Sequence, residues 1–363
     1  MVNKQKRKKY TVHFDNAKAK EVFSIIKSEW DKKEESGVFH GLVLPQDNYI
    51  PSYLSEKELS LLFFYAVLGQ RGSIDSDRPM KIWAEFRKRV PEAFDTAFVL
   101  ENFSSEMILS GLWETIGANN TRDRNKPNRG FKLKEISEFW IYNSEELLKF
   151  WDGDPRNIFS GVNNFKDAFK RIERKAGKTA FKGIGMKVFA LLTIYLQERN
   201  LISIFPTPLP VDFHTLRILW ATGIIKRSGW IRPCSITKNR PEQIIGKPAV
   251  NIYYEFPNRV AYWSTRFMRE NGFSHLDMNP AIWLLSRSLC SKNFQNTSRK
   301  EATQYIDAYK LANDFSLWPR DYKDPCRICP IERHCKWIIP SAPYWKWGLL
   351  VKLGRRVSFP RLL

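Results

Sequence analysis

The stretch Gly183-Ile184-Gly185-Met186-Lys187 leads directly into an apolar run over residues 188–196, and this junction decides how the rest of the chain is interpreted. Two glycines on either side of one residue let the backbone take positive φ and bring its amides close to a ligand. The following helix would point its positive end the same way. Such a turn can bind phosphate oxygens, although the motif alone is more often just a tight connection.

Positive charge gathers on the amino-terminal side of this turn. The basic residues there are Lys166, Lys170, Arg171, Arg174, Lys175, Lys178 and Lys182. A basic run is usually a solvated helix face, but this one leads into the turn. Lysine and arginine number 59 against 38 acidic residues in the whole chain, a formal net charge of +21, which favours a polyanionic partner. The longest apolar runs are too short to span a bilayer, so we expect no membrane partner.

Length and cysteine content narrow the class of protein further. The chain has 363 residues and 43% hydrophobic content, enough for one large core or two modest ones. Residues 1–10 are basic and no apolar segment follows them, which indicates a solvated arm rather than a secretory signal. Five cysteines do not make a disulfide scaffold in a chain this long. We therefore expect a reducing, cytoplasmic or nucleoid-associated setting (nuclear in a eukaryote) and a cysteine-bound cofactor.

Helical spacing dominates the pattern and predicts an all-α fold. Residues 60–68 form an apolar run that predicts a buried helix ending at Gly69. Asn143 with Glu146 has the spacing of an N-cap signature, and Asp212 stands where an N-cap should precede a helix that ends at Gly223. Pro280 suggests the first turn of a helix over residues 281–289. Only residues 249–256 look extended.

The second informative motif is Val211-Asp212-Phe213-His214, followed by Thr-Leu-Arg. A lysine that has lost its proton is a nucleophile, and a carboxylate can stabilise an oxocarbenium-like sugar as a base departs. A lysine and an aspartate therefore suit the same reaction. Two structural interpretations compete: Lys187 only neutralises phosphate, or Asp212 only caps its helix.

The order of these motifs resembles the helix-hairpin-helix DNA glycosylases that carry an iron-sulfur cluster, the group of endonuclease III and the adenine glycosylase of mismatch repair. The resemblance covers residues 59–337. It implies that Lys187 attacks the sugar carbon in members that also cleave the strand, and that Asp212 assists as the charge partner. It also implies two helical lobes, the HhH-GPD architecture, with double-stranded DNA bound by a monomer.

Cysteine spacing carries the cofactor argument. Cys326, Cys329 and Cys335 form C-x2-C-x5-C, which matches the last three ligands of the family's [4Fe-4S] cluster. Cys290 would be the fourth, with residues 291–325 as an insertion before Cys326. Four thiolates also suit zinc, but the five-residue gap is longer than in most zinc knuckles. Cys234 is expected to be a thiol without a ligand role.

DNA contacts are expected at several places along the chain. The candidates are Gly183, Gly185 and Lys182 of the turn, Lys175 and Lys178 of the basic run, and Gln70, which by resemblance probes the duplex where the base was. Residues 119–134 form a basic insertion, and Trp113, Trp140 and Trp230 are candidates for stacking on a base.

The motifs also predict how the chain is divided into domains. We expect a basic arm (1–10), a segment packing with the cluster lobe (11–54), a helical lobe ending in the hairpin (55–205), a lobe with the Asp helix and cluster (206–345) and a basic tail (346–363). The predicted activity is base excision from duplex DNA, with Lys-dependent strand cleavage at the resulting abasic site left open. The alternative is a non-catalytic or RNA-directed nucleic-acid binder that keeps the hairpin and the cluster.

Overall fold

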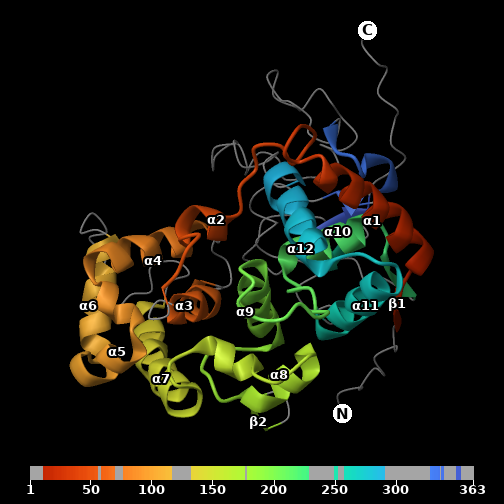
Figure 1. The fold of residues 1–363 in the computed structure, drawn as a ribbon. Coiled ribbons are helices and arrows are strands. Elements are labelled where there is room, and N and C mark those ends of the chain that lie inside the picture. The colour runs from red at the N-terminus through yellow and green to blue at the C-terminus, as the bar shows by residue number, and fades with distance from the viewer. Residues whose placement is uncertain are drawn as a thin grey trace, which may run out of the picture. The chain divides into compact units, whose positions relative to one another are not determined.

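The computed structural model describes residues 11–55, 59–69, 77–116, 132–175, 178–228, 249–251, 257–290, 328–335, 337–338 and 349–352. These residues divide into two compact units, unit 1 from Met1–Leu42 and Val211–Leu363, and unit 2 from Val43–Pro210. Both units are mostly helical, which confirms the predicted all-α class at that level. Figure 1 shows the helices of both units with their labels. The borders expected from the sequence followed residues 54 and 205.

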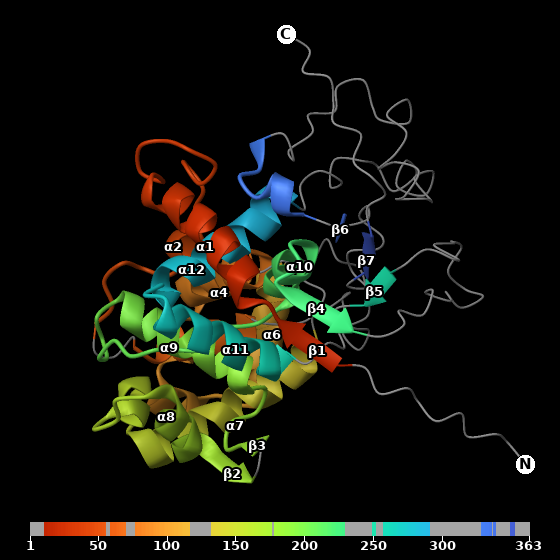
Figure 2. The same cartoon turned by 90° about the vertical axis from the view of Figure 1, so that its right-hand side faces the viewer.

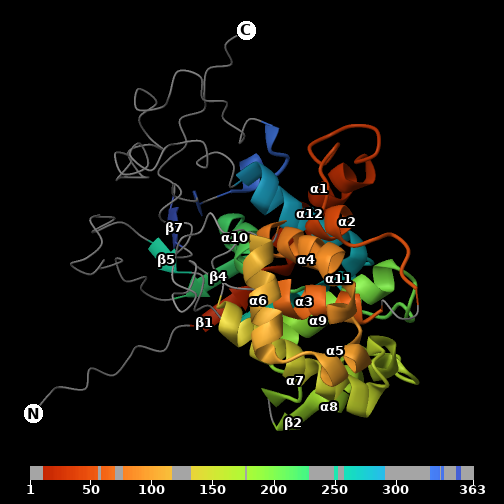
Figure 3. The same ribbon diagram turned by 90° about the vertical axis from the view of Figure 1, so that its left-hand side faces the viewer.

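Unit 2 is built from helices and one short hairpin. Its helices are α2 (Pro45–Tyr49), α3 (Ser60–Gly69), α4 (Asp77–Arg89), α5 (Thr96–Asn102), α6 (Ser105–Ile116), α7 (Leu133–Trp151), α8 (Phe165–Ile172) and α9 (Met186–Glu198), with 3-10 helices at Pro91–Phe94 and Pro155–Phe159. Strands β2 (Glu173–Lys175) and β3 (Lys178–Thr179) pair antiparallel after α8. Contacts join α3 to α4 and α9, and α6 to α7 (Figure 3).

The core of unit 2 is strongly aromatic. Helix α3 is apolar on all sides, as expected of a helix that is buried all round, and Phe63 and Phe64 are fully buried in it. Trp140 of α7 is also fully buried, stacks on Phe64 with ring centroids 4.8 Å apart, and donates its indole N–H to the Ala93 carbonyl at 2.7 Å. Residues 188–197 of α9 are buried without a break. Helix α9, whose first turn carries Lys187, is therefore packed into this core.

Unit 1 joins the two ends of the described chain. It contains β1 (Thr11–Phe14), α1 (Asn16–Asp31), α10 (Phe213–Ala221), β4 (Ile225–Ser228), β5 (Ala249–Asn251), α11 (Pro257–Glu270), α12 (His275–Leu284), a π-helix (Leu285–Cys290), a 3-10 helix (Glu332–His334), β6 (Trp337–Ile338) and β7 (Leu349–Lys352). Strand β1 pairs antiparallel with β4, from Thr11↔Ser228 to Phe14↔Ile225 (Figure 2). Strand β7 lies between β5 and β6.

Helix α1 packs on α12 through one apolar face. Its buried residues are Ala19, Val22, Phe23, Ile26 and Trp30, which follow the spacing of an amphipathic helix. The Trp30 indole N–H donates to Asp277 of α12 at 3.3 Å. Residues near the start of the chain therefore pack against α12, although 247 positions in the sequence separate Trp30 from Asp277.

Three sequence predictions about these elements need correction. Asn143 is not an N-cap, because α7 continues through it from Leu133 to Trp151. Pro280 lies inside α12, which begins earlier, after Ser274 caps it by accepting from the Leu276 N–H. Trp140 is a core residue and is not available to stack on a base. The expected strand at 249–256 is described only over β5, Ala249–Asn251.

Two helix boundaries are confirmed. Asp212 is the N-cap of α10, and Gly223 follows its end with φ +78°. No helix among the described residues is long and apolar enough to cross a membrane.

Candidate functional site

Of the two glycines in the turn before α9, only one has the positive φ that the sequence predicted. Gly183 has φ +79°, a conformation that favours glycine. Gly185 is the N-cap of α9 and is extended, at φ −116° and ψ −177°, so it does not need positive φ. A Cβ built on Gly185 would meet no atom within 4 Å, so open space lies before the amino end of α9. Lys187 lies in the first turn of this helix and is half-buried.

Side chains of α7 contact this turn and hold its backbone in place. The side chain of Asn143, fully buried, accepts from the Lys182 N–H at 2.7 Å and donates to the Lys182 carbonyl at 3.0 Å. The ring of Phe139 lies 3.3 Å from the position that a Cβ on Gly183 would take. The Lys182 ammonium lies 4.9 Å from the centre of the Tyr142 ring. Positions 139, 142 and 143, which share one face of α7, therefore contact the turn, and the Lys182 side chain stays exposed.

The basic run does not lead into the turn as a single helix. Helix α8 ends at Ile172, and the β2–β3 hairpin follows, with Lys175 paired to Lys178 in its register. Lys166, Lys170 and Arg171 lie on α8, and the last two fall in its final turn, where positive charge suits the helix dipole. The side chains of Lys175 and Lys178 lie outside the described residues.

Asp212 is positioned by its own helix in unit 1. Its Oδ1 accepts from the Thr215 N–H at 2.9 Å, and the side chain is half-buried. His214, two residues on, brings its Nδ1 within 3.3 Å of the Ser286 hydroxyl. Arg217 is fully buried and donates from Nη1 to the Ser286 carbonyl at 3.3 Å. The π-helix is thus joined to α10 through Ser286.

Three of the four candidate ligand cysteines belong to the described part of unit 1. Cys290 ends the π-helix, while Cys329 and Cys335 flank the 3-10 helix Glu332–His334, and all three are half-buried. Burial raises the pKa of the Cys290 thiol, and the nearby Arg217 opposes that shift. Cys326 lies outside the described residues. Among the residues described, no three His, Cys, Asp or Glu side chains form a metal-binding group.

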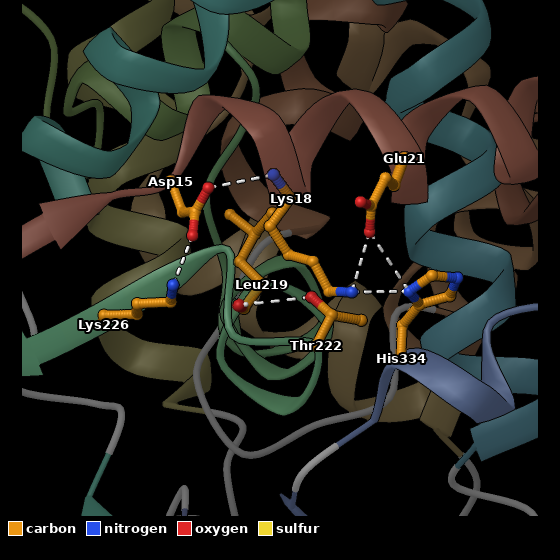
Figure 4. Close-up of polar contacts among 7 residues, drawn as sticks. All are labelled: Asp15, Lys18, Glu21, Leu219, Thr222, Lys226 and His334. Carbon is orange, nitrogen blue, oxygen red and sulfur yellow. Dashed lines mark hydrogen bonds and ion pairs between the residues drawn. The ribbon is translucent and has the colours of Figure 1, made fainter.

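The loop between Cys329 and Cys335 is held by the amino-terminal helix. The Lys18 ammonium lies 2.6 Å from Nδ1 of His334 and 2.9 Å from Glu21 Oε2, and that oxygen lies 3.6 Å from His334 Nδ1 (Figure 4). Because an ammonium can only donate, Nδ1 of His334 is the acceptor and the ring proton is on Nε2. One turn earlier, Asp15 caps α1 and forms an ion pair with Lys226 of β4.

The pKa directions at this junction follow from these contacts. Hydrogen bonding to Lys226 lowers the pKa of Asp15, and the Lys18 N–H adds to that effect. Desolvation lowers the pKa of His334, and the positive charge of Lys18 lowers it further. No sequence pattern predicted these contacts, since 316 positions separate Lys18 from His334.

Several predicted contacts lie beyond the described residues, and one group of residues was missed. Gln70, Trp230, Cys234 and most of the 119–134 insertion are outside them, and Trp113 is half-buried against the core of unit 2. Sequence reasoning missed Trp283 and Arg287, half-buried residues that contact or adjoin His214 and Ser286. Their i,i+4 spacing was the available signal.

Lys187 and the turn belong to unit 2, while Asp212 and the cysteines belong to unit 1. Comparisons with protein-family models, with curated proteins and with solved structures find no match to this chain.

Proposed function

We propose that the chain is a DNA N-glycosylase of the helix-hairpin-helix type, which removes a damaged, mispaired or modified base from double-stranded DNA. The observation that carries the proposal is the turn from Lys182 to Gly185. It has positive φ at Gly183, is fixed by Asn143 and opens directly on the helix that presents Lys187. A rigid turn at a helix amino end suits a phosphate of the DNA backbone. The net charge of +21 supports a polyanionic partner.

Lys187 and Asp212 have distinct roles in the proposed reaction. The glycosidic bond breaks, its electron pair leaves with the base, and the sugar carbon becomes positively charged. The Asp212 carboxylate, oriented by its cap to the Thr215 N–H, stabilises that charge. The amine nitrogen of Lys187 then attacks the same carbon and forms a bond to it, or water does so in an enzyme that stops at the abasic site, and the proton that the attacking nitrogen or oxygen loses neutralises the departed base.

The cofactor forms part of the same proposal. Cys290, Cys326, Cys329 and Cys335 would hold a [4Fe-4S] cluster, with zinc as the alternative. The chemistry of Cys290 suits a metal ligand, because burial disfavours its bare thiolate while Arg217 favours it, and ligation replaces the thiol proton. Four thiolates bound to one group would cross-link segments that are far apart in the sequence, which is a structural contribution.

One observation favours a second candidate, a nucleic-acid binder without catalysis. The contact from Asp212 to the Thr215 N–H is a complete helix cap and accounts for an aspartate at this position without any chemistry. Both candidates bind nucleic acid, and they differ in what Asp212 and Lys187 do to it.

A base-release assay separates the two candidates. Purified protein is incubated with duplexes that each carry one modified or mispaired base, with and without borohydride. We expect release from at least one duplex, about 100-fold slower in Asp212→Asn, which keeps the cap oxygen but loses about 3 kcal/mol of charge stabilisation. Lys187→Gln should abolish borohydride trapping, while Lys149→Gln, at an exposed position of α7, retains it. No release by the parent protein from any duplex would favour the binder, and full release by Asp212→Asn would make Asp212 structural.

A further inference from the structure

A tryptophan and an arginine form a stacked pair where α12 passes into the π-helix. The guanidinium carbon of Arg287 lies 4.9 Å from the centre of the Trp283 ring, four positions earlier. Both side chains are half-buried. A π-helical turn is rare and is frequent at functional sites, and this one carries Arg287 and ends at Cys290.

The pair is fixed to the helix that Asp212 caps. The His214 ring meets the Trp283 ring edge-on, with centroids 5.7 Å apart and an angle of 67° between the planes. Ser286 of the π-helix is fully buried and contacts His214 and Arg217 of α10. Trp283 and Arg287 therefore have a fixed position relative to the first two turns of α10.

Stacking suits an arginine to bind phosphate. The guanidinium carbon lies over the ring within the range of a cation–π contact, and the N–H groups of a guanidinium lie in its own plane, where they can form paired hydrogen bonds to phosphate oxygens. An indole platform thus orders a long side chain before any ligand arrives, which lowers the entropy lost on binding. In a chain with net charge +21, the matching ligand is a phosphodiester.

We propose that Arg287, stacked on Trp283, contacts a backbone phosphate of duplex DNA close to the nucleotide on which Asp212 acts. The contact is made by unit 1 alone and is separate from the turn before α9. It rests on the proposed function for the identity of the partner, because duplex DNA is the substrate proposed for Asp212. It does not depend on base release.

The structure offers a matched control for this pair. Arg259 of α11 lies 5.8 Å from the centre of the Trp263 ring, again four positions apart and in unit 1. Arg259→Met and Arg287→Met therefore remove the same charge from the same kind of stack. Only Arg287 lies on the segment that Ser286 joins to α10.

The experiment measures binding of the full chain to a duplex that carries a tetrahydrofuran abasic analogue, which cannot undergo base release. We expect Arg287→Met to weaken binding by about tenfold and to lower the slope of log affinity against log salt by about one. Arg259→Met should change neither, and Arg287→Lys should restore the slope because the charge returns. Thermal unfolding of each variant shows whether the fold persists.

The outcomes keep this proposal apart from the proposed function. Equal binding by Arg287→Met and the parent, or equal losses in Arg287→Met and Arg259→Met, would overturn the phosphate contact. A slope that stays low in Arg287→Lys would assign the effect to packing and overturn it as well. A parent that binds the analogue but releases no base would instead overturn catalysis, and the phosphate contact would stand on its own salt slope.

Discussion

The turn before α9 and the loop from Cys329 to Cys335 both carry candidate functional groups, yet they are held in different ways. The turn is fixed by the fully buried side chain of Asn143, through two hydrogen bonds to the Lys182 backbone. The loop is held by partly exposed charged contacts, from Lys18 and Glu21 to His334. Buried neutral contacts are insensitive to salt, whereas exposed ionic contacts are weak and screened. The turn should therefore be rigid, and the loop should open readily.

The largest expected effect tests the support beneath the turn. Trp140→Ala removes a fully buried ring from α7, the helix that contacts the turn. It also leaves the Ala93 carbonyl without the indole N–H that donates to it. We expect unit 2 to lose about 3 to 5 kcal/mol of unfolding free energy. Urea unfolding measures the loss. Phe150→Ala, on an exposed position of the same helix, should cost about 0.5 kcal/mol or less. Similar losses in both variants would refute a core role for Trp140.

A smaller effect is expected from Asn143, whose side chain holds the backbone of the turn. Asn143→Ala leaves the Lys182 N–H and carbonyl without their side-chain partner, which should cost about 2 kcal/mol. If the turn binds phosphate, affinity for duplex DNA should also fall about tenfold, because the backbone amides lose their fixed direction. Asn157→Ala is the control, since Asn157 donates one hydrogen bond to the Trp151 carbonyl in the same unit. Asn157→Ala should lower stability without lowering affinity. A loss of affinity equal to that of Asn143→Ala would contradict a specific role for Asn143 in holding the turn.

These residues also show what the sequence could and could not predict. Asp212 was identified as an N-cap because a cap is a local contact, between residues three positions apart. Asn143 has the same local signature with Glu146, but its side chain is used 39 positions away, at Lys182. Trp140 lay near basic segments, yet burial is set by helices that are distant in sequence. Local spacing thus identified elements and one cap, and it failed wherever tertiary contacts decide what a side chain does.

The third expected effect is a pH dependence of unit 2. Burial raises the pKa of Glu198 in α9 to about 7, the nearby Asp47 adds to the rise, and Arg199 opposes it. Between the ordinary value of 4.5 and about 7, the folded chain keeps a proton that the unfolded chain has released, so stability falls as pH rises through this window. The loss should be about 1 to 2 kcal/mol, less than the full shift implies, because the residue keeps some solvent contact.

Urea unfolding at pH 5 and pH 8 measures this slope. Glu198→Gln removes the titrating group and should flatten it, whereas Glu145→Gln on the exposed side of α7 should leave it unchanged. An unchanged slope in Glu198→Gln would mean that the core of unit 2 does not penalise this charge. The contrast between the neutral, buried contacts of unit 2 and the charged contacts around the cysteine loop of unit 1 would then weaken.

The smallest expected effect lies in the cysteine loop and tests the other half of the comparison. Lys18→Met removes the ammonium that contacts His334 and Glu21 but keeps the length of the side chain. We expect a loss of at most about 1 kcal/mol, because these contacts are partly exposed, together with faster hydrogen exchange at the Cys335 N–H, which donates to the Glu332 carbonyl. Added salt should speed this exchange in the parent but have little effect in Lys18→Met. Lys20→Met, on an exposed position of α1, should leave hydrogen exchange at the Cys335 N–H as it is in the parent, with and without added salt. Exchange that is slow, salt-insensitive and equal in all three proteins would show that the loop is held by something other than α1.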